Sequence, residues 1–89
     1  MQLILYSKPG CHLCEGLQEK LEQIKTLNLK VETRDITTRE DWFKAYQYEV
    51  PVLCQKWGET ETIIPRPSPR LSVARLEKLL QKYTSEKRL

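Results

Sequence analysis

The sequence contains little cysteine, glycine or histidine and no long hydrophobic run. Its 89 residues include three cysteines, three glycines and one histidine. No apolar run approaches the roughly 20 residues that a membrane-spanning helix needs. The apolar stretch at residues 2–6 is too short for a secretory signal and has no positive charge before it. An odd number of cysteines is a poor framework for extracellular disulfides, so we expect a cytoplasmic protein that does not bind membranes.

The net charge is also small. Fifteen Lys and Arg residues against twelve Asp and Glu residues give a formal net charge of +3. Nucleic-acid-binding proteins usually have a denser basic face, so we expect no nucleic acid among the partners. An apolar fraction of 39% and a charged fraction of 30% are typical of a globular protein. A chain of this length forms one domain, residues 1–89, which we expect to be a monomer.

The first half of the chain alternates between strand and helix patterns. Residues 2–7 form a short apolar run that Pro9 and Gly10 end, which indicates a strand. Apolar residues then recur every three or four positions, typical of an amphipathic helix that ends near Asn28. The apolar face of this helix consists of Leu13, Cys14, Leu17, Leu21, Ile24 and Leu27. Gly16 costs about 1 kcal/mol relative to Ala inside a helix, so we expect it to serve a close packing contact.

A second strand and a short aromatic helix come next. In residues 30–36, Val31, Thr33 and Asp35 alternate with polar residues, which indicates a strand. The strand–helix–strand order predicts that this strand and the first one form a parallel pair with a right-handed crossover. Thr37 or Thr38 can cap the following helix, with Glu40 and Asp41 in its first turn. Its buried side is predicted to contain Trp42, Phe43, Tyr46 and Tyr48.

The remainder of the chain predicts a hairpin and a last helix. Residues 50–54 and 60–64 are strand-like and flank a Trp-Gly-Glu turn at 57–59. Ser68 and Pro69 form a suitable cap and first-turn pair for the last helix. The apolar residues of this helix are Leu71, Ala74, Leu76, Leu79, Leu80 and Tyr83. The complete order is β-α-β-α-β-β-α, an α/β fold with helices on both faces of one sheet.

The most specific feature is a pair of cysteines, Cys11 and Cys14, at the start of the first helix. The first N–H groups of a helix have no partner within it, and the helix dipole adds positive potential there. Both favour a thiolate at Cys11, since cysteines in such places have pKa values of roughly 3.5–7.5 instead of about 8.5. Cys14 lies one turn further on the same face, at a spacing compatible with a disulfide. We expect it to be the more buried sulfur, beside Leu17.

This arrangement predicts different tasks for the two sulfurs. Cys11 would attack a substrate disulfide and form a mixed disulfide, and Cys14 would then attack Cys11 and release the reduced substrate. The simpler interpretation is two ordinary buried cysteines on successive helical turns. Cys11 fits that interpretation poorly because it follows Pro9 and Gly10 and precedes the apolar stripe, so we favour the redox role.

Three segments resemble the glutaredoxin-like members of the thioredoxin superfamily: SKPGCHLC at 7–14, VETRDI at 31–36 and YEVPVL at 48–53. The resemblance covers nearly the whole chain in matching order. It implies a thioredoxin-like fold of the glutaredoxin type with a four-stranded mixed sheet. It also implies that the Val50–Pro51 bond is cis, that Pro51 faces the cysteine pair, and that the Val50 backbone binds an extended substrate or glutathione. An ordinary proline at a strand start is the alternative for Pro51.

The resemblance also bears on glutathione and on partners. Glutaredoxins that use glutathione usually carry a Gly-Gly-Asp-like turn before the last helix, and residues 64–70 read IPRPSPR instead. Arg66 or Arg70 could bind the tripeptide's carboxylate in its place, so glutathione stays open as a co-substrate. We expect no tightly bound cofactor. The implied substrate is a disulfide-containing protein or a low-molecular-weight thiol, with glutathione or a reductase as the electron source.

Four further side chains are candidates for smaller roles. Lys8 matches a lysine often found in glutaredoxins, and it would favour the thiolate and bind an anionic substrate; the alternative is a solvated loop lysine. His12 would favour the thiolate when protonated, or it is a solvent-facing spacer. Tyr6 lines the cleft or belongs to the core. Cys54 is expected to pack as a small hydrophobic residue, with a second resolving thiol as the alternative.

Two other classes of function stay open. One is a non-catalytic thioredoxin-fold binding module, in which the cysteines only shape a surface. The other is a metal or iron–sulfur carrier that uses Cys11, Cys14, Cys54 and His12. A structural zinc site normally has two pairs of ligands and the sequence shows one pair, so we expect no metal site.

Overall fold

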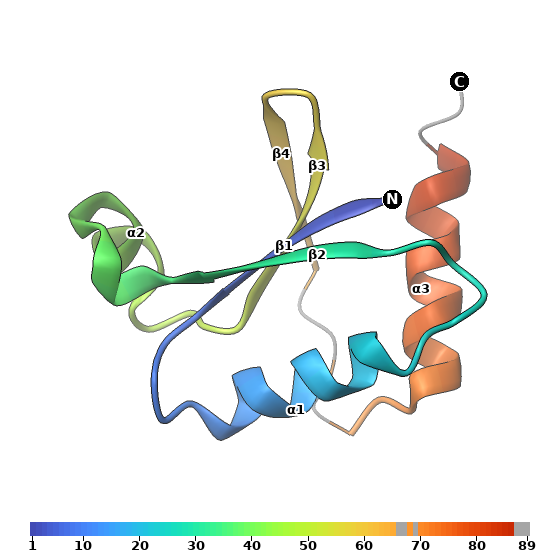
Figure 1. Cartoon of the computed structure of the whole chain (residues 1–89), viewed down its shortest axis with the longest axis horizontal. Helices are drawn as coiled ribbons and strands as arrows, with labels where there is room; N and C mark the ends of the chain where they lie inside the picture. The colour runs from blue at the N-terminus through green and yellow to red at the C-terminus, as the bar shows by residue number, and fades with distance from the viewer. Residues whose placement is uncertain (66–67, 69, 87–89) are drawn as a thin grey trace.

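A computed structural model describes residues 1–65, 68 and 70–86, with side chains described as far as Tyr83. Its elements follow the predicted order (Figure 1). They are β1 (Gln2–Ser7), α1 (His12–Glu22), β2 (Lys30–Asp35), a 3-10 turn η1 (Ile36–Thr38), α2 (Glu40–Tyr46), β3 (Val52–Trp57), β4 (Thr60–Ile64) and α3 (Val73–Glu86). Within the described residues, no helix is long and apolar enough to cross a membrane.

The four strands form one mixed sheet in the order β2-β1-β3-β4. β1 pairs in parallel with β2, as the crossover through α1 requires, and antiparallel with β3. β3 and β4 form the predicted hairpin, in which Trp57 lies opposite Thr60 and Gly58 has a φ of +58°. Glycine adopts this left-handed conformation readily, which suits a tight two-residue turn. The predicted four-stranded mixed sheet is therefore confirmed.

Alternate residues of β1 pack into two apolar clusters. Leu3 and Leu5 belong to the larger cluster, which α1 and α3 complete. Ile4 and Tyr6 belong to the second cluster, which includes Cys14, Val50 and Cys54 and against which the α2 aromatics pack. Figure 1 shows α2 at the opposite end of the sheet from α3. Successive residues of a strand point to opposite faces, so the two clusters place α3 on one face of the sheet and α2 on the other, as predicted.

The helix α1 ends earlier than the predicted end near Asn28. Its last residue is Glu22, and the next two N–H groups, of Gln23 and Ile24, bond to carbonyls only three residues back. This tighter winding ends the helix and turns the chain toward β2. Ile24 nevertheless stays in the core, because the apolar spacing continues past the end of the helix.

Two further predictions about α1 are wrong. Leu13 is 48% exposed and does not belong to the buried face. A Cβ atom built at Gly16 would meet nothing within 4 Å, so this glycine serves no close packing contact.

The segment after β2 differs from the prediction in its caps. Asp35, rather than Thr37 or Thr38, caps the 3-10 turn, because its Oδ1 accepts hydrogen bonds from the Thr37 hydroxyl (2.6 Å) and backbone N–H (2.9 Å). Both hydrogen bonds lower the pKa of the Asp35 carboxyl, and the bond from the Thr37 hydroxyl contributes most. The following helix α2 has Arg39 as its N-cap and no side-chain capping bond.

Only half of the predicted aromatic face of α2 is directed to the core. Trp42 and Tyr46 pack against the second cluster. Phe43 is 39% exposed and Tyr48 is 88% exposed. Trp42 and Tyr46 are four residues apart and therefore share one face of the helix. Phe43 points about 100° away from Trp42 around the helix axis, and Tyr48 lies beyond the end of the helix.

The last helix also starts later than predicted. It begins at Val73, and the Ser72 hydroxyl accepts a hydrogen bond from the Arg75 N–H at 3.2 Å. The Ser68 hydroxyl instead accepts from the Arg70 N–H in the preceding turn, so its prediction as the helix cap is wrong. The partner predicted for it, Pro69, lies outside the described residues.

Candidate redox site

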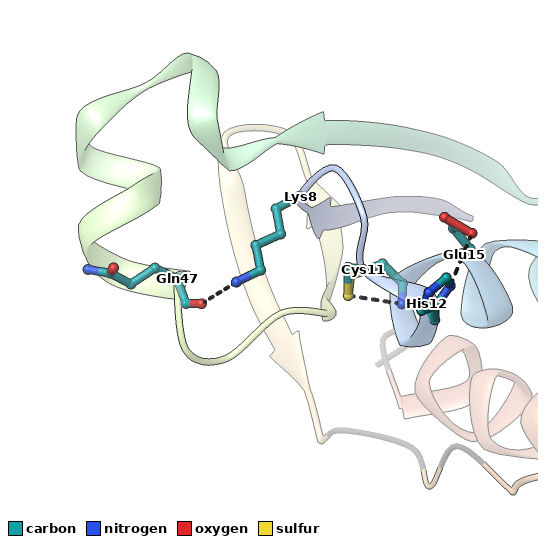
Figure 2. The surroundings of a disulfide bond; sticks show 6 residues. Lys8, Cys11, His12, Glu15 and Gln47 are labelled. Atoms are coloured by element: carbon teal, nitrogen blue, oxygen red, sulfur yellow. Dashed lines mark hydrogen bonds and ion pairs between the residues drawn. A yellow bond between two sulfur atoms is a disulfide. The ribbon is translucent and has the colours of Figure 1, made fainter.

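Cys11 is the N-cap of α1. Its backbone is extended, with φ of −88° and ψ of 102°, and the positive φ of 78° at Gly10 turns the loop into the helix. The Cys11 N–H bonds to the Lys8 carbonyl at 3.3 Å, which closes this turn. The Cys11 sulfur accepts a hydrogen bond from the Cys14 N–H at 3.2 Å (Figure 2). A first-turn N–H group and the positive end of the helix dipole thus meet at this sulfur, which favours negative charge there.

Cys14 joins Cys11 in a disulfide, with their Cα atoms 5.3 Å apart. The predicted proximity of the two cysteines is therefore confirmed. Cys14 is only 3% exposed, whereas Cys11 lies partly at the surface. One sulfur can meet a second molecule while the other lies beneath it, as the sequence predicted.

Val50 and Pro51 connect α2 to β3, and the peptide bond between them is cis. Both residues are buried, and Val50 shares the second cluster with Cys14, against which Cys11 packs. The Val50 N–H donates a hydrogen bond to the Tyr46 carbonyl at 3.1 Å. A substrate that bound this N–H would have to replace that bond.

Lys8 and His12 flank the cysteines but interact with other groups. The Lys8 ammonium donates to the Gln47 carbonyl at 3.4 Å, and Figure 2 shows its side chain reaching toward the end of α2. The His12 side chain is 94% exposed, with its Nδ1 3.9 Å from Glu15 Oε2. Their predicted effects on a thiolate or a substrate stay predictions.

Tyr6 lies in the core, the second of its two predicted positions, at 2% exposure. Its hydroxyl donates to Glu61 Oε1 at 2.6 Å and accepts from Arg34 Nη1 at 2.9 Å. Arg34 Nη1 also donates to Glu61 Oε2 at 3.3 Å. Burial is the main cause that raises the pKa of the Tyr6 hydroxyl, and the hydrogen bond to Glu61 is the second. A hydrogen bond to Glu32 is the main cause that raises the pKa of Arg34, so the guanidinium stays charged.

Arg34 is a member of this network that no sequence pattern indicated. A charged residue on an alternating strand is usually solvated, yet the Arg34 side chain is only 17% exposed. The signal that could have found it is the register of the predicted parallel pair, which places Arg34 directly beside Tyr6.

Cys54 is a free thiol that is 1% exposed, in the cluster that contains Tyr6 and Cys14. Burial, more than the nearby charge of Glu61, raises the pKa of this thiol to about 11. It therefore stays protonated at neutral pH and packs as a small hydrophobic residue, which confirms the prediction.

Two other predictions concern ligands. Among the described residues, no group of three or more His, Cys, Asp or Glu side chains could hold a metal ion. Of the two arginines considered for a carboxylate, Arg70 is exposed and Arg66 lies outside the described residues.

Solved structures with a similar fold include thioredoxin 1 from Thermosipho africanus TCF52B. It has a TM-score of 0.66 and 16% identity, and the match covers 100% of both chains. A structural-genomics target protein from X. campestris has a TM-score of 0.63 and 29% identity, with 90% of this chain and 96% of that chain covered. A malarial protein has a TM-score of 0.56 and 13% identity, with 91% and 93% covered. No curated protein matches the sequence.

These likenesses show that the fold is that of thioredoxin. At the level of sequence, the family described as "Glutaredoxin-like domain (DUF836)" matches residues 2–81, which include both cysteines and the cis-proline loop. The chain therefore belongs to this glutaredoxin-like family.

Proposed function

We propose that this protein is a thiol–disulfide oxidoreductase in which Cys11 is the nucleophile and Cys14 the resolving thiol. The observation that supports this most directly is the position of the Cys11 sulfur, partly exposed and bonded to the Cys14 N–H at the start of α1. The burial of Cys14 at 3% exposure supports its role as the sheltered partner.

The proposed reaction begins with the reduced protein. The Cys11 thiolate attacks one sulfur of a substrate disulfide, the substrate S–S bond breaks, and the departing substrate sulfur takes up a proton. Cys14 then loses its proton and attacks Cys11, which releases the second substrate thiol and leaves the Cys11–Cys14 disulfide. The substrate gains two electrons and the protein loses two. A reductase, or two molecules of glutathione, returns the dithiol form.

Cys11 and the Val50–Pro51 loop meet at the second cluster, so this loop is the proposed docking place for the extended chain beside the substrate disulfide. The exposed Lys8 ammonium lies 3.4 Å from the Gln47 carbonyl in the connection that leads to this loop, and it would favour a substrate with an acidic residue beside its cysteine. We place this chemistry in a reducing cytoplasm, where exchange through a two-cysteine site is common.

Trapping the mixed disulfide tests the function. A Cys14→Ser variant, incubated with a disulfide-containing peptide, should accumulate a covalent adduct at Cys11 that dithiothreitol releases. A Cys11→Ser variant should form none, and Cys54→Ala should behave as the wild type because Cys54 is buried. Absence of an adduct in the Cys14→Ser variant would favour the non-catalytic binding module. Supplying either glutathione or thioredoxin reductase as the electron source then identifies the reductant.

A further inference from the structure

The helix α2 has little burial of its own. It spans seven residues, none of which is fully buried, and it carries no side-chain cap at its start. Two aromatic side chains hold it to the sheet, both against Tyr6 of β1. The ring centroid of Tyr46 lies 4.6 Å from that of Tyr6, and the centroid of Trp42 lies 5.8 Å away in an edge-on arrangement. The aromatic contacts of α2 with the sheet are therefore concentrated on Tyr6.

Arg34 of β2 reinforces this attachment. Its guanidinium carbon lies 5.1 Å from the Trp42 ring centroid and 5.6 Å from that of Tyr6. Ion pairs with Glu32 and Glu61 and the bond to the Tyr6 hydroxyl fix the guanidinium from the sheet side. A cation held this firmly over a ring restricts where the ring can lie. Arg34 thus connects the sheet to Trp42, and through Trp42 to α2.

The other end of α2 touches both loops of the redox site. The Tyr46 carbonyl accepts the bond from the Val50 N–H at 3.1 Å, and the Gln47 carbonyl accepts the bond from Lys8 at 3.4 Å. Figure 2 shows this second bond bridging from the cysteine loop to α2. These two bonds connect the end of α2 to the Val50–Pro51 loop and to the loop before Cys11.

We propose that Arg34 is a positioning residue for the exchange reaction, which holds α2 through Trp42 so that the Val50–Pro51 loop lies ready for an extended substrate beside Cys11. The inference rests on the proposed function, because positioning has meaning only if a disulfide substrate binds there. In the proposed role, Arg34 acts on the redox site through α2 and not through contact with the reacting sulfurs. It should thus affect the binding of a macromolecular substrate and leave the intrinsic reactivity of Cys11 unchanged.

The test compares Arg34→Gln with wild type in the reduction of a disulfide-containing peptide. We expect KM to rise roughly tenfold, equivalent to about 1.4 kcal/mol of binding, with kcat changed less. The rate of Cys11 alkylation by iodoacetamide, a small reagent that needs no docking loop, should change less than about twofold. Arg34→Lys keeps the positive charge but lacks the planar guanidinium group, so its KM should lie between those of the wild type and Arg34→Gln.

Arg39 provides the matched control. Its guanidinium also lies near the Trp42 ring, at 4.8 Å, but it is 58% exposed. Among the described residues its ion pair is with Asp41 on its own segment, rather than with the sheet residues that hold Arg34. Arg39→Gln should leave KM within about twofold of the wild type. If it raised KM as much as Arg34→Gln, the anchored position of Arg34 would not be the cause and the proposal would be wrong.

Two outcomes separate this proposal from the proposed function. If the wild type reduces the peptide and a folded Arg34→Gln protein has an unchanged KM, the positioning role fails and the function stands. If the wild type reduces nothing, both fail. Should Arg34→Gln not fold, Glu61→Gln replaces it. This variant removes the charge that pairs with Arg34, while its amide oxygen can still accept the bond from the Tyr6 hydroxyl. Its KM should rise about two- to threefold, and an unchanged value overturns the proposal.

Discussion

Replacing Gly16 by alanine should stabilise the protein. Gly16 lies inside α1, has no positive φ, and a Cβ atom there would meet nothing within 4 Å. The added methyl group therefore costs no packing, while the helix gains the difference in propensity between Gly and Ala. That difference is about 0.8–1 kcal/mol in the free energy of unfolding. For a domain of this size it corresponds to a rise in Tm of about 4–8 °C.

Urea unfolding and thermal unfolding, both followed by circular dichroism on the oxidised protein, measure this change. Gly58→Ala is the matched control, because a Cβ atom at Gly58 also meets nothing within 4 Å but the residue has a φ of +58°. Alanine in this conformation costs about 1–2 kcal/mol, so the control should be less stable than the wild type. The same substitution of glycine by alanine should thus raise the free energy of unfolding at position 16 and lower it at position 58. A Gly16→Ala protein no more stable than the wild type would show that helix propensity does not limit stability at this position.

Two further predictions concern buried groups. Gln55 is 1% exposed, and its Oε1 has no hydrogen-bond partner among the described residues. Methionine has a similar shape and no unpaired oxygen, so Gln55→Met should raise the free energy of unfolding by about 1–2 kcal/mol in urea titrations. A loss of stability would show that the amide is satisfied. Burial raises the pKa of Cys54 to about 11. The unfolded chain therefore loses this proton first, and stability should fall by roughly 2–3 kcal/mol as pH rises from about 9 to 11. Cys54→Ala, in the oxidised protein, should lack that part of the decline; identical pH curves for the two proteins would contradict the assignment.

The regular parts of the fold could be predicted because their signals are repeated along the chain. The spacing of Leu17 and Leu21 indicates a helix face, and the unbroken apolar run of Leu3, Ile4 and Leu5 indicates a buried strand, whose residues the structure divides between two clusters. Several residues contribute to each such signal, so no single substitution hides it. The cysteine pair could be predicted for a related reason, since the chemistry needs both its spacing and its place at a helix start.

The ends of the helices could not be predicted as well, because single residues compete there. Ser68 and Ser72 are both suitable caps by type, and only the path of the chain into the core decides that Ser72 caps α3. The network of Arg34, Tyr6 and Glu61 joins three strands. No local pattern records such a network, because its members meet only once the sheet has formed.

The decisive experiment for the proposed nucleophile is the pH dependence of Cys11 alkylation in the fully reduced protein. Cys14 and Cys54 are buried, so the first modification by iodoacetamide should occur at Cys11, and a Cys11→Ser variant should lack it. We expect the rate to reach half its maximum at a pH between roughly 3.5 and 7.5, because the first-turn N–H stabilises the thiolate. A half-maximal rate near pH 8.5, the value for an ordinary cysteine, would contradict it.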